Sequence, residues 1–152
     1  MKTALVLLLL FNISAHSAEC VSYIGTTVLA GKLTRHTFPE QPNYESIEKG
    51  DAAATYFFVS PHQPICVGEG KNNDGLEPAE SEVTEIQLVF LDPKKSYHQL
   101  RPFLRKQVFC QGRIYHAHTG HHHSPVLLFD AECRPTHHSS GPARKAAQVR
   151  SM

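Results

Sequence analysis

Four cysteines behind an apolar leader constrain the fold of this chain more than any other feature. Met1-Lys2 precedes an apolar run over residues 4–11 and small or polar residues over 14–18, which is the three-part pattern of a secretory signal peptide. We expect residues 1–18 to be removed and the chain to be exported, to the periplasm or the extracellular medium. The run is too short to span a bilayer, and no later stretch is apolar enough to be a membrane span.

Disulfides persist in an oxidising compartment, so the even set of cysteines predicts two of them. The set comprises Cys20, Cys66, Cys110 and Cys133, which allow three pairings. We favour Cys110 with Cys133, because they would face each other at the open end of a predicted hairpin, and Cys20 with Cys66 then follows by elimination. A zinc site of cysteine and histidine is the alternative, but the chain has no Cys-x-x-Cys pair.

Length and charge predict one acidic domain with a basic tail. The 152 residues, 41% of them hydrophobic, suit one globular domain. All 14 acidic residues lie between Glu19 and Glu132, whereas several of the 15 basic ones follow. We therefore expect a domain over 19–133 and a disordered basic tail over 134–152. The acidic balance of the domain argues against a nucleic-acid partner, since phosphate binding needs clustered Lys and Arg.

The order of apolar patterns predicts a mainly β fold. Strand patterns cover 27–33, 54–59, 83–90, 108–115 and 125–133, and a short helix capped by Ser96 falls between the third and fourth. This order fits a five-stranded, partly open barrel of the oligonucleotide/oligosaccharide-binding (OB) type, with a small α+β sheet as the main rival. The predicted core comprises Val28, Leu33, Phe57, Ile86, Leu88, Leu100, Leu104, Val108, Ile114, Val126 and Leu128.

Three connections stand out between these strands. In OB-type barrels, the loops that join strands one to two and four to five flank the usual binding face. Here those loops hold the segment Asn43-Tyr44-Glu45-Ser46 and a histidine cluster between the last two strands. We expect the two loops to meet and to form the functional surface. The acidic stretch Gly68–Ser81 has no clear pattern and is predicted to be a mobile surface loop.

The histidine cluster places five imidazoles within eight residues. They are His116, His118, His121, His122 and His123. Clustered ring nitrogens can bind zinc, copper or nickel, for which His118, His121 and His123 are the candidate ligands. Neighbouring residues on a strand alternate faces, so residues 121–123 converge on one ion only if the turn bends them inward. The alternative is a structural role, in which a ring hydrogen-bonds to the backbone or to Glu45.

The other loop invites a catalytic interpretation and a structural one. A carboxylate such as Glu45 beside an imidazole is a usable acid/base pair, and Ser46 could be a nucleophile. Equally, Asn43, Ser46 and Asp51 suit turns that tie a long loop to itself. The chain has no Gly-x-Ser-x-Gly elbow and no His-Glu-x-x-His motif, which weakens the catalytic interpretation.

Several of these stretches together resemble a family of small exported bacterial proteins classed as a domain of unknown function. They are Phe38-Pro39, Pro42 to Ile47 with Gly50-Asp51, Ile86-Gln87-Leu88, Thr119 to His123, and Pro125 to Leu128. The resemblance covers roughly Cys20 to Phe129. The chain departs from the family pattern at Glu40-Gln41, where the family has a glycine and a basic residue, and at Ser124, where it has threonine. The resemblance implies a barrel-like domain and two shared motifs, but no activity.

Two functions from different classes follow. The first is an exported, non-catalytic binding or interaction module, whose two loops form a polar patch for a small ligand, a glycan, a protein or a metal ion. The second is a small hydrolase-like enzyme that uses Glu45 and a cluster histidine, which requires these groups to lie about 3 Å apart or to share one water. A transition-metal-binding protein is a further alternative. Candidate binding residues are Asn43, Tyr44, Glu45, Ser46, Asp51 and the five histidines.

Overall fold

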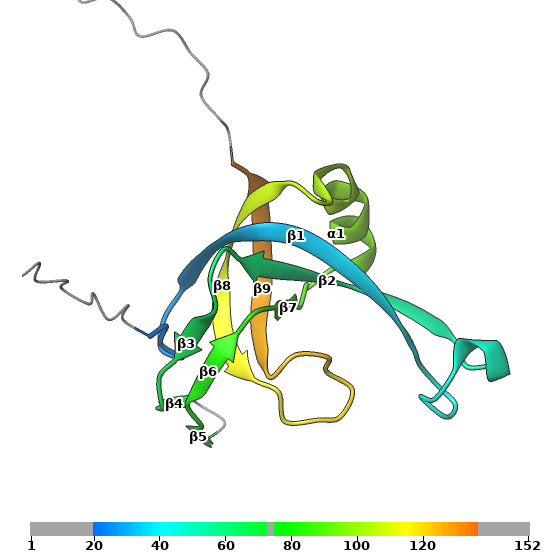
Figure 1. Ribbon diagram of the computed structural model, residues 1–152, viewed down its shortest axis with the longest axis horizontal. Helices are drawn as coiled ribbons and strands as arrows, with labels where there is room; N and C mark the ends of the chain where they lie inside the picture. Colours follow the sequence, from blue (N-terminus) through cyan, green and yellow to red (C-terminus); the bar gives the residue numbers. More distant parts are fainter. Residues whose placement is uncertain (1–19, 73–74, 137–152) are drawn as a thin grey trace, which may run out of the picture.

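The computed structural model describes residues 20–72 and 75–136 (Figure 1). The expected signal peptide lies outside the described residues, and so does the expected tail beyond Thr136. Within the described ranges, no helix has the length and apolar character needed to cross a membrane.

Five strands form the body of the molecule. In spatial order they are β1 (Thr27–Pro39), β2 (Ala53–Pro61), β7 (Ile86–Leu88), β9 (Val126–Pro135) and β8 (Gln107–His116), and β8 pairs with β1 again. All pairings are antiparallel except that of β7 with β9 (Figure 1). The predicted five-stranded, mainly β fold with a helix between the third and fourth barrel strands is confirmed. Strand pairing runs around the whole ring, but β7 meets each neighbour over only two residue pairs, so the barrel is weakly joined there.

The stretch 68–81, predicted to be an unpatterned loop, contains three short strands. A second layer pairs β3 (Ile65–Val67) with β6 (Glu80–Val83), and β4 (Gly70–Asn72) pairs with β5 (Gly75–Glu77). Val67 and Val83 are buried and fasten this layer to the core. The prediction failed because strands of three or four residues are too short to show alternation, and glycines and carboxylates hid the remaining pattern.

The strand β1 bends around the barrel and pairs with two neighbours. Its first half pairs with β8 and its second with β2, and Gly31 faces a residue of each. A Cβ on Gly31 would lie 2.4 Å from the Ser60 carbonyl oxygen, so only glycine permits this close approach. Within the same strand, Leu33 is buried but Val28 is 56% exposed, so the prediction of a buried Val28 is wrong. The two residues are five apart, and an odd separation places them on opposite faces of a strand.

The helix α1 (Pro93–Leu100) starts before the predicted cap at Ser96. The carboxylate of Asp92 accepts a hydrogen bond from the Lys95 backbone N–H at 3.0 Å, and Pro93 occupies the first helical turn. An acidic N-cap followed by proline is a stronger start signal than an internal serine. The 3-10 helix η2 (Arg101–Phe103) follows, and a second, η1 (Ile47–Lys49), lies in the β1–β2 loop.

Both favoured disulfides are present in the described chain. Cys110 and Cys133 lie directly opposite each other on β8 and β9, and Cys20 is bonded to Cys66. The strand β9 continues to Pro135, two residues past the predicted domain boundary at 133. Nine of the predicted core residues are buried and Leu104 is half-buried against them; the nine are Leu33, Phe57, Ile86, Leu88, Leu100, Val108, Ile114, Val126 and Leu128.

Candidate functional site

The connection between β8 and β9 carries the five histidines and is fixed at its base. The Ala117 backbone N–H donates to the Pro125 carbonyl oxygen at 2.9 Å. The His123 backbone N–H donates to Oε1 of Gln87 at 2.8 Å, and the Gln87 side chain is buried in the barrel strand β7. The loop is thereby attached to the rigid sheet rather than extending freely into solvent.

Ser124 provides a second attachment. Its buried Oγ lies 2.6 Å from the Glu85 carbonyl oxygen and 3.3 Å from the Val126 backbone nitrogen, so the hydroxyl donates to the first and accepts from the second. Threonine, which the resemblance implies at this position, carries the same hydroxyl. The substitution therefore keeps the group that fastens the loop.

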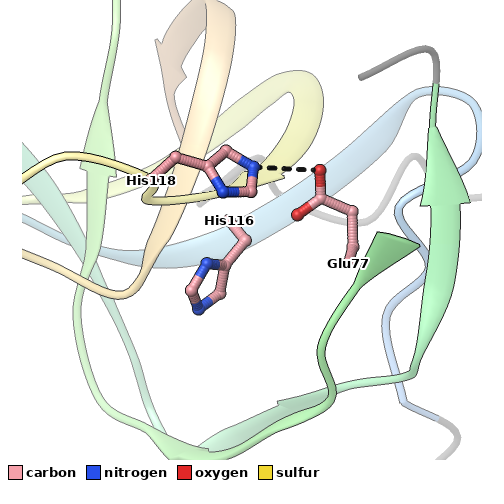
Figure 2. Close-up of side chains that lie close together, drawn as sticks. All are labelled: Glu77, His116 and His118. Carbon is pink, nitrogen blue, oxygen red and sulfur yellow. Dashed lines mark hydrogen bonds and ion pairs between the residues drawn. The ribbon is translucent and has the colours of Figure 1, made fainter. Parts of the chain in front are cut away.

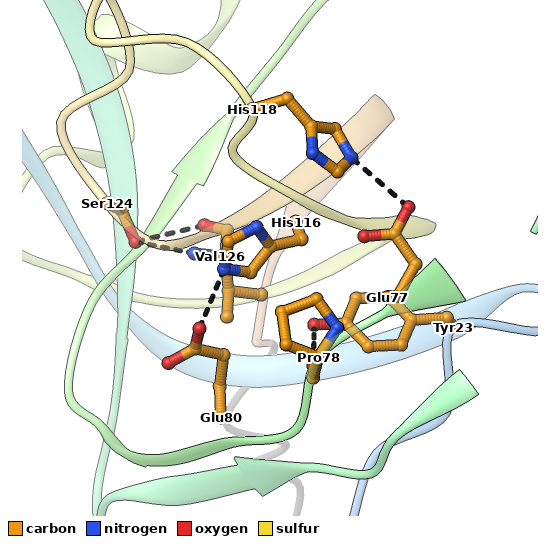
Figure 3. Close-up of polar contacts among 8 residues, drawn as sticks. All are labelled: Tyr23, Glu77, Pro78, Glu80, His116, His118, Ser124 and Val126. Carbon is orange, nitrogen blue, oxygen red and sulfur yellow. Dashed lines mark hydrogen bonds and ion pairs between the residues drawn. The ribbon is translucent and has the colours of Figure 1, made fainter. Parts of the chain in front are cut away.

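His116 and His118 form the first of two histidine groups and are called here the proximal histidines. They are two residues apart, so they leave the end of β8 on one side, with ring centroids 5.6 Å apart. His118 Nε2 lies 3.3 Å from Oε1 of Glu77, and His116 Nε2 lies 2.7 Å from Oε1 of Glu80 (Figures 2 and 3). Both carboxylates come from the second layer, at β5 and β6. This part of the loop is polar and faces acidic groups.

His121, His122 and His123 form the second group, called here the distal histidines. The His121 ring lies 4.7 Å from that of Tyr44, and the His123 ring stacks on Phe38 at 3.5 Å. His123 Nε2 is buried and has no hydrogen-bond partner within the described ranges. Burial lowers the pKa of His123, against the opposing charge of Glu40, and lowers the pKa of His122. The rings of His121 and His123 therefore contact aromatic rings, and burial favours the neutral form of His122 and His123.

The β1–β2 loop is folded around the carboxylate of Asp51. Oδ1 of Asp51 accepts from the backbone and side-chain nitrogens of Asn43 at 2.9 and 3.1 Å. Oδ2 accepts from the backbone N–H groups of Glu45 and Ser46, each at 2.8 Å. These hydrogen bonds, led by that from Ser46, lower the pKa of Asp51 against the opposing effect of burial. In this arrangement Asn43, Ser46 and Asp51 hold the loop, as the structural interpretation of the sequence requires.

The two loops meet, but through Tyr44 rather than through Glu45. The backbone of Tyr44 has a φ of 60°, and its ring contacts His121. The Glu45 side chain is exposed, and within residues 20–72 and 75–136 no hydrogen bond or ion pair joins its carboxylate to an imidazole. The structure therefore does not bring together the acid/base pair of the enzyme hypothesis.

The three candidate metal ligands are also separated. His118 lies beside Glu77, whereas His121 contacts Tyr44 and His123 stacks on Phe38. In the part of the chain that the structure describes, the group with donor atoms close enough to hold an ion is Glu77, His116 and His118. The loop turns its proximal and distal histidines toward different neighbours, which sequence spacing alone does not reveal.

A cavity of about 270 Å³ lies beside the distal histidines. Its lining includes the aromatic residues Tyr56, Phe57, Phe90 and Tyr97, together with His121 and His122. A larger cavity of about 410 Å³ lies between α1 and β9, but neither motif loop lines it. The smaller cavity is therefore lined both by the histidine loop and by the barrel strands β2 and β7.

Several residues of the site were missed by sequence reasoning. Glu77 and Glu80 lie in the stretch taken for a mobile loop, and Phe38, Tyr56 and Gln87 were not proposed as site residues. One signal in the sequence could have found the two glutamates. The stretch 68–81 is acidic, and carboxylates are natural partners for a dense cluster of imidazoles. For Phe38 and Gln87, the family motifs contained the residues but not their contacts.

Comparison with known proteins supports the resemblance without adding an activity. The family model of a domain of unknown function (DUF4431) matches residues 85–129. The matched stretch runs from the end of the second layer through β7, α1 and β8 to the histidine loop and the start of β9. It ends at Phe129, as expected, but begins well after Cys20, so the β1–β2 loop lies outside it. No curated protein and no solved structure matches the chain.

Proposed function

We propose that this protein is an exported, non-catalytic module that binds a small ligand at the distal histidines. Export is supported by the three-part leader and by the two disulfides, which are stable in an oxidising compartment. A binding role is supported by an aromatic cavity that His121 and His122 help to line, and by the contact of His121 with Tyr44 of the other motif loop. Polar groups on loops held by a rigid scaffold mark recognition sites more often than packing sites.

The cavity carries this proposal, because its size and lining define a ligand class. Small-molecule sites are mostly apolar, with a few convergent polar groups, and span roughly 300–1,000 Å³ for drug-sized ligands. At about 270 Å³ this cavity suits a ligand with one ring, such as a single sugar unit or a one-ring aromatic acid. The half-buried rings of Phe90 and Tyr97 can stack on a ligand, while His121 and His122 offer ring nitrogens for hydrogen bonds.

Tyr97 is held in place independently of any ligand. Its hydroxyl accepts a hydrogen bond from Nη1 of Arg35 at 2.8 Å, and its ring lies 5.6 Å from that of Phe57. A wall that is already ordered loses little conformational entropy when a ligand binds. The part of the cavity wall formed by Tyr97 is therefore preorganised.

Ligand-observed and protein-observed NMR with a panel of monosaccharides and one-ring aromatic acids tests the proposal. We expect one class to shift the resonances of His121, His122 and Tyr97, and Tyr97→Ala to weaken its binding by up to about 10-fold, the worth of an aromatic pair. The exposed His62 lies outside the cavity lining, so His62→Ala is the matched control and should bind as the wild type does. Binding that is unaffected by Tyr97→Ala, or a panel without any binder, contradicts the proposal.

A further inference from the structure

The proximal histidines form a second cluster with a buried carboxylate, separate from the aromatic cavity. Glu77, His116 and His118 each offer one donor atom, and these atoms lie within 4.8 Å of one another. Figure 2 shows the His118 imidazole pointing toward the Glu77 carboxylate, with the His116 ring below it. Glu77 is 1% exposed, whereas the side chain of His118 is 56% exposed, so the cluster joins the interior to solvent.

The distances suit a small cation between the donors. Ligands that lie 2.0–2.1 Å from a tetrahedral zinc ion are about 3.3 Å apart. His118 Nε2 and Glu77 Oε1 already lie 3.3 Å apart. Two donor atoms that lie as much as 4.8 Å apart must approach each other by about 1.5 Å to bind the same zinc ion. Rotation of the side chains can supply this movement.

The donor types select the class of ion. Two imidazoles and one carboxylate suit zinc, copper or nickel, whereas calcium and magnesium take oxygen ligands. All four cysteines are in disulfides, so none supplies a thiolate. Two histidines with one glutamate is a known three-ligand zinc set, which leaves a fourth position for water or another ligand.

Glu80 orients one of the ligands. Its Oε1 lies 2.7 Å from His116 Nε2, and in Figure 3 it lies across the His116 ring from Glu77. Metal-bound histidines usually donate the other ring N–H to a carboxylate, which fixes the ring and its tautomer. With Nε2 held by Glu80, Nδ1 of His116 is the nitrogen left for an ion. The cluster thus has three candidate ligands, and the carboxylate of Glu80 holds one of them in place.

The segment that carries the two carboxylates is itself fastened. The Tyr23 hydroxyl donates to the Pro78 carbonyl oxygen at 2.8 Å, between Glu77 and Glu80 in the chain (Figure 3). The Cys20–Cys66 disulfide secures the chain that leads to Tyr23. Ligands held by packed neighbours keep their geometry better than ligands on a free loop.

We propose that Glu77, His116 and His118 bind one divalent transition-metal ion, with zinc as the best fit, and that Glu80 positions His116. The site uses none of the residues that line the aromatic cavity, so it stands or falls independently of the proposed ligand binding. It also replaces the metal set that the sequence predicted, of which only His118 is retained.

Calorimetric titration of the untagged mature protein with zinc chloride, together with native mass spectrometry, tests the site. We expect one zinc ion per chain, and no binding at this stoichiometry for magnesium or calcium. His118→Ala should abolish the binding and, because the side chain is largely exposed, should leave the fold intact by circular dichroism. Glu80→Gln should retain the site with about 10- to 100-fold weaker affinity, as expected of an outer carboxylate.

Matched controls separate this site from other histidines. His121→Ala changes an exposed histidine of the same loop, and the double variant His137→Ala/His138→Ala removes the histidines near the end of the chain. Both should bind zinc as the wild type does. The proposal is overturned if the wild type binds no zinc, if His118→Ala binds it normally, or if either control loses it.

Discussion

The proximal and distal histidines belong to one loop but have opposite surroundings. His116 and His118 face the carboxylates of Glu80 and Glu77, whereas His121 and His123 contact the rings of Tyr44 and Phe38. Imidazole suits both, because it is a metal ligand and hydrogen-bonding group as well as a flat ring. The difference teaches that a dense histidine motif need not be one site, since the neighbours supplied by the rest of the fold decide each ring's role.

Removing a disulfide should have the largest effect on stability, and the two disulfides should differ in their effect on zinc binding. In the chain-entropy model, closing loops with sequence separations of 46 and 23 residues stabilises by about 4 and about 3.4 kcal/mol. Cys20→Ser/Cys66→Ser should lower the unfolding free energy by about 4 kcal/mol and also weaken zinc binding, because this bridge secures the segment around Tyr23. Urea unfolding monitored by circular dichroism gives the first quantity, and zinc titration gives the second.

The matched comparison is Cys110→Ser/Cys133→Ser. This bridge joins β8 and β9 away from the histidine loop, so its loss should lower stability without changing zinc affinity under conditions where the chain remains folded. Equal effects of the two pairs on zinc affinity would show that the second layer does not support the proximal histidines.

A smaller effect should appear at the distal histidines alone. Gln87→Leu places an apolar side chain of similar size in the core and removes the acceptor for the partly buried His123 backbone N–H, at a cost of about 1–3 kcal/mol. We expect lower stability and altered NMR resonances of residues 121–123, with unchanged zinc binding at His116 and His118. Thermal unfolding and two-dimensional NMR measure these results, and a loss of zinc binding would show that the two groups are coupled.

The smallest effect concerns pH. Burial lowers the pKa of His122 and His123 from the ordinary 6.5, with Glu40 opposing the shift at His123. As pH falls through about 6.5, the unfolded chain therefore takes up protons first, and the unfolding free energy decreases. The contribution is fully present above that pH. We expect His122→Gln to flatten the dependence of the melting temperature on pH between about 7 and 5.5.

Thr119→Ala is the control for this experiment, because it changes an exposed, non-titrating residue of the same loop. An unchanged slope in His122→Gln would contradict the role of burial at the distal histidines.

The carboxylates of Asp51 and Glu85 affect stability at lower pH than the histidines do. Their ordinary pKa values are 3.8 and 4.5, and hydrogen bonds lower both pKa values by more than burial raises them. Their contribution is present above these values and is lost as pH falls below them.

The sequence predicted the parts of the fold that depend on nearby residues. Alternation identified Leu33, Ile86 and Ile114 as core residues, and the hairpin register placed Cys110 opposite Cys133. Val28 was misplaced because it lies an odd number of residues from Leu33, and strand alternation puts such a pair on opposite faces. The strands β4 to β6 were missed because their stability comes from contacts with distant segments rather than from their own pattern.

The site was predictable only in its location. The two motif loops do meet, as the barrel topology requires, but the contact is made by Tyr44 and not by Glu45. Glu77 approaches His118 from a segment 41 positions earlier in the chain, and a pairing of that kind leaves no local signature. The residue types identified the histidines as candidate binding groups, and only the fold showed which carboxylates and aromatic rings lie beside them.

The pairing of β1 with β8 has a consequence for how the chain assembles. Thr27 lies opposite Gly112, so the barrel closes only when segments from the two ends of the domain meet, and such distant pairings form slowly. The β8–β9 hairpin, by contrast, is local and can form from a single stretch of chain. As the chain is synthesised, one edge of β1 therefore stays open until residues 107–116 arrive. An open edge can pair with another chain, so the interval before closure is when this protein is most exposed to aggregation.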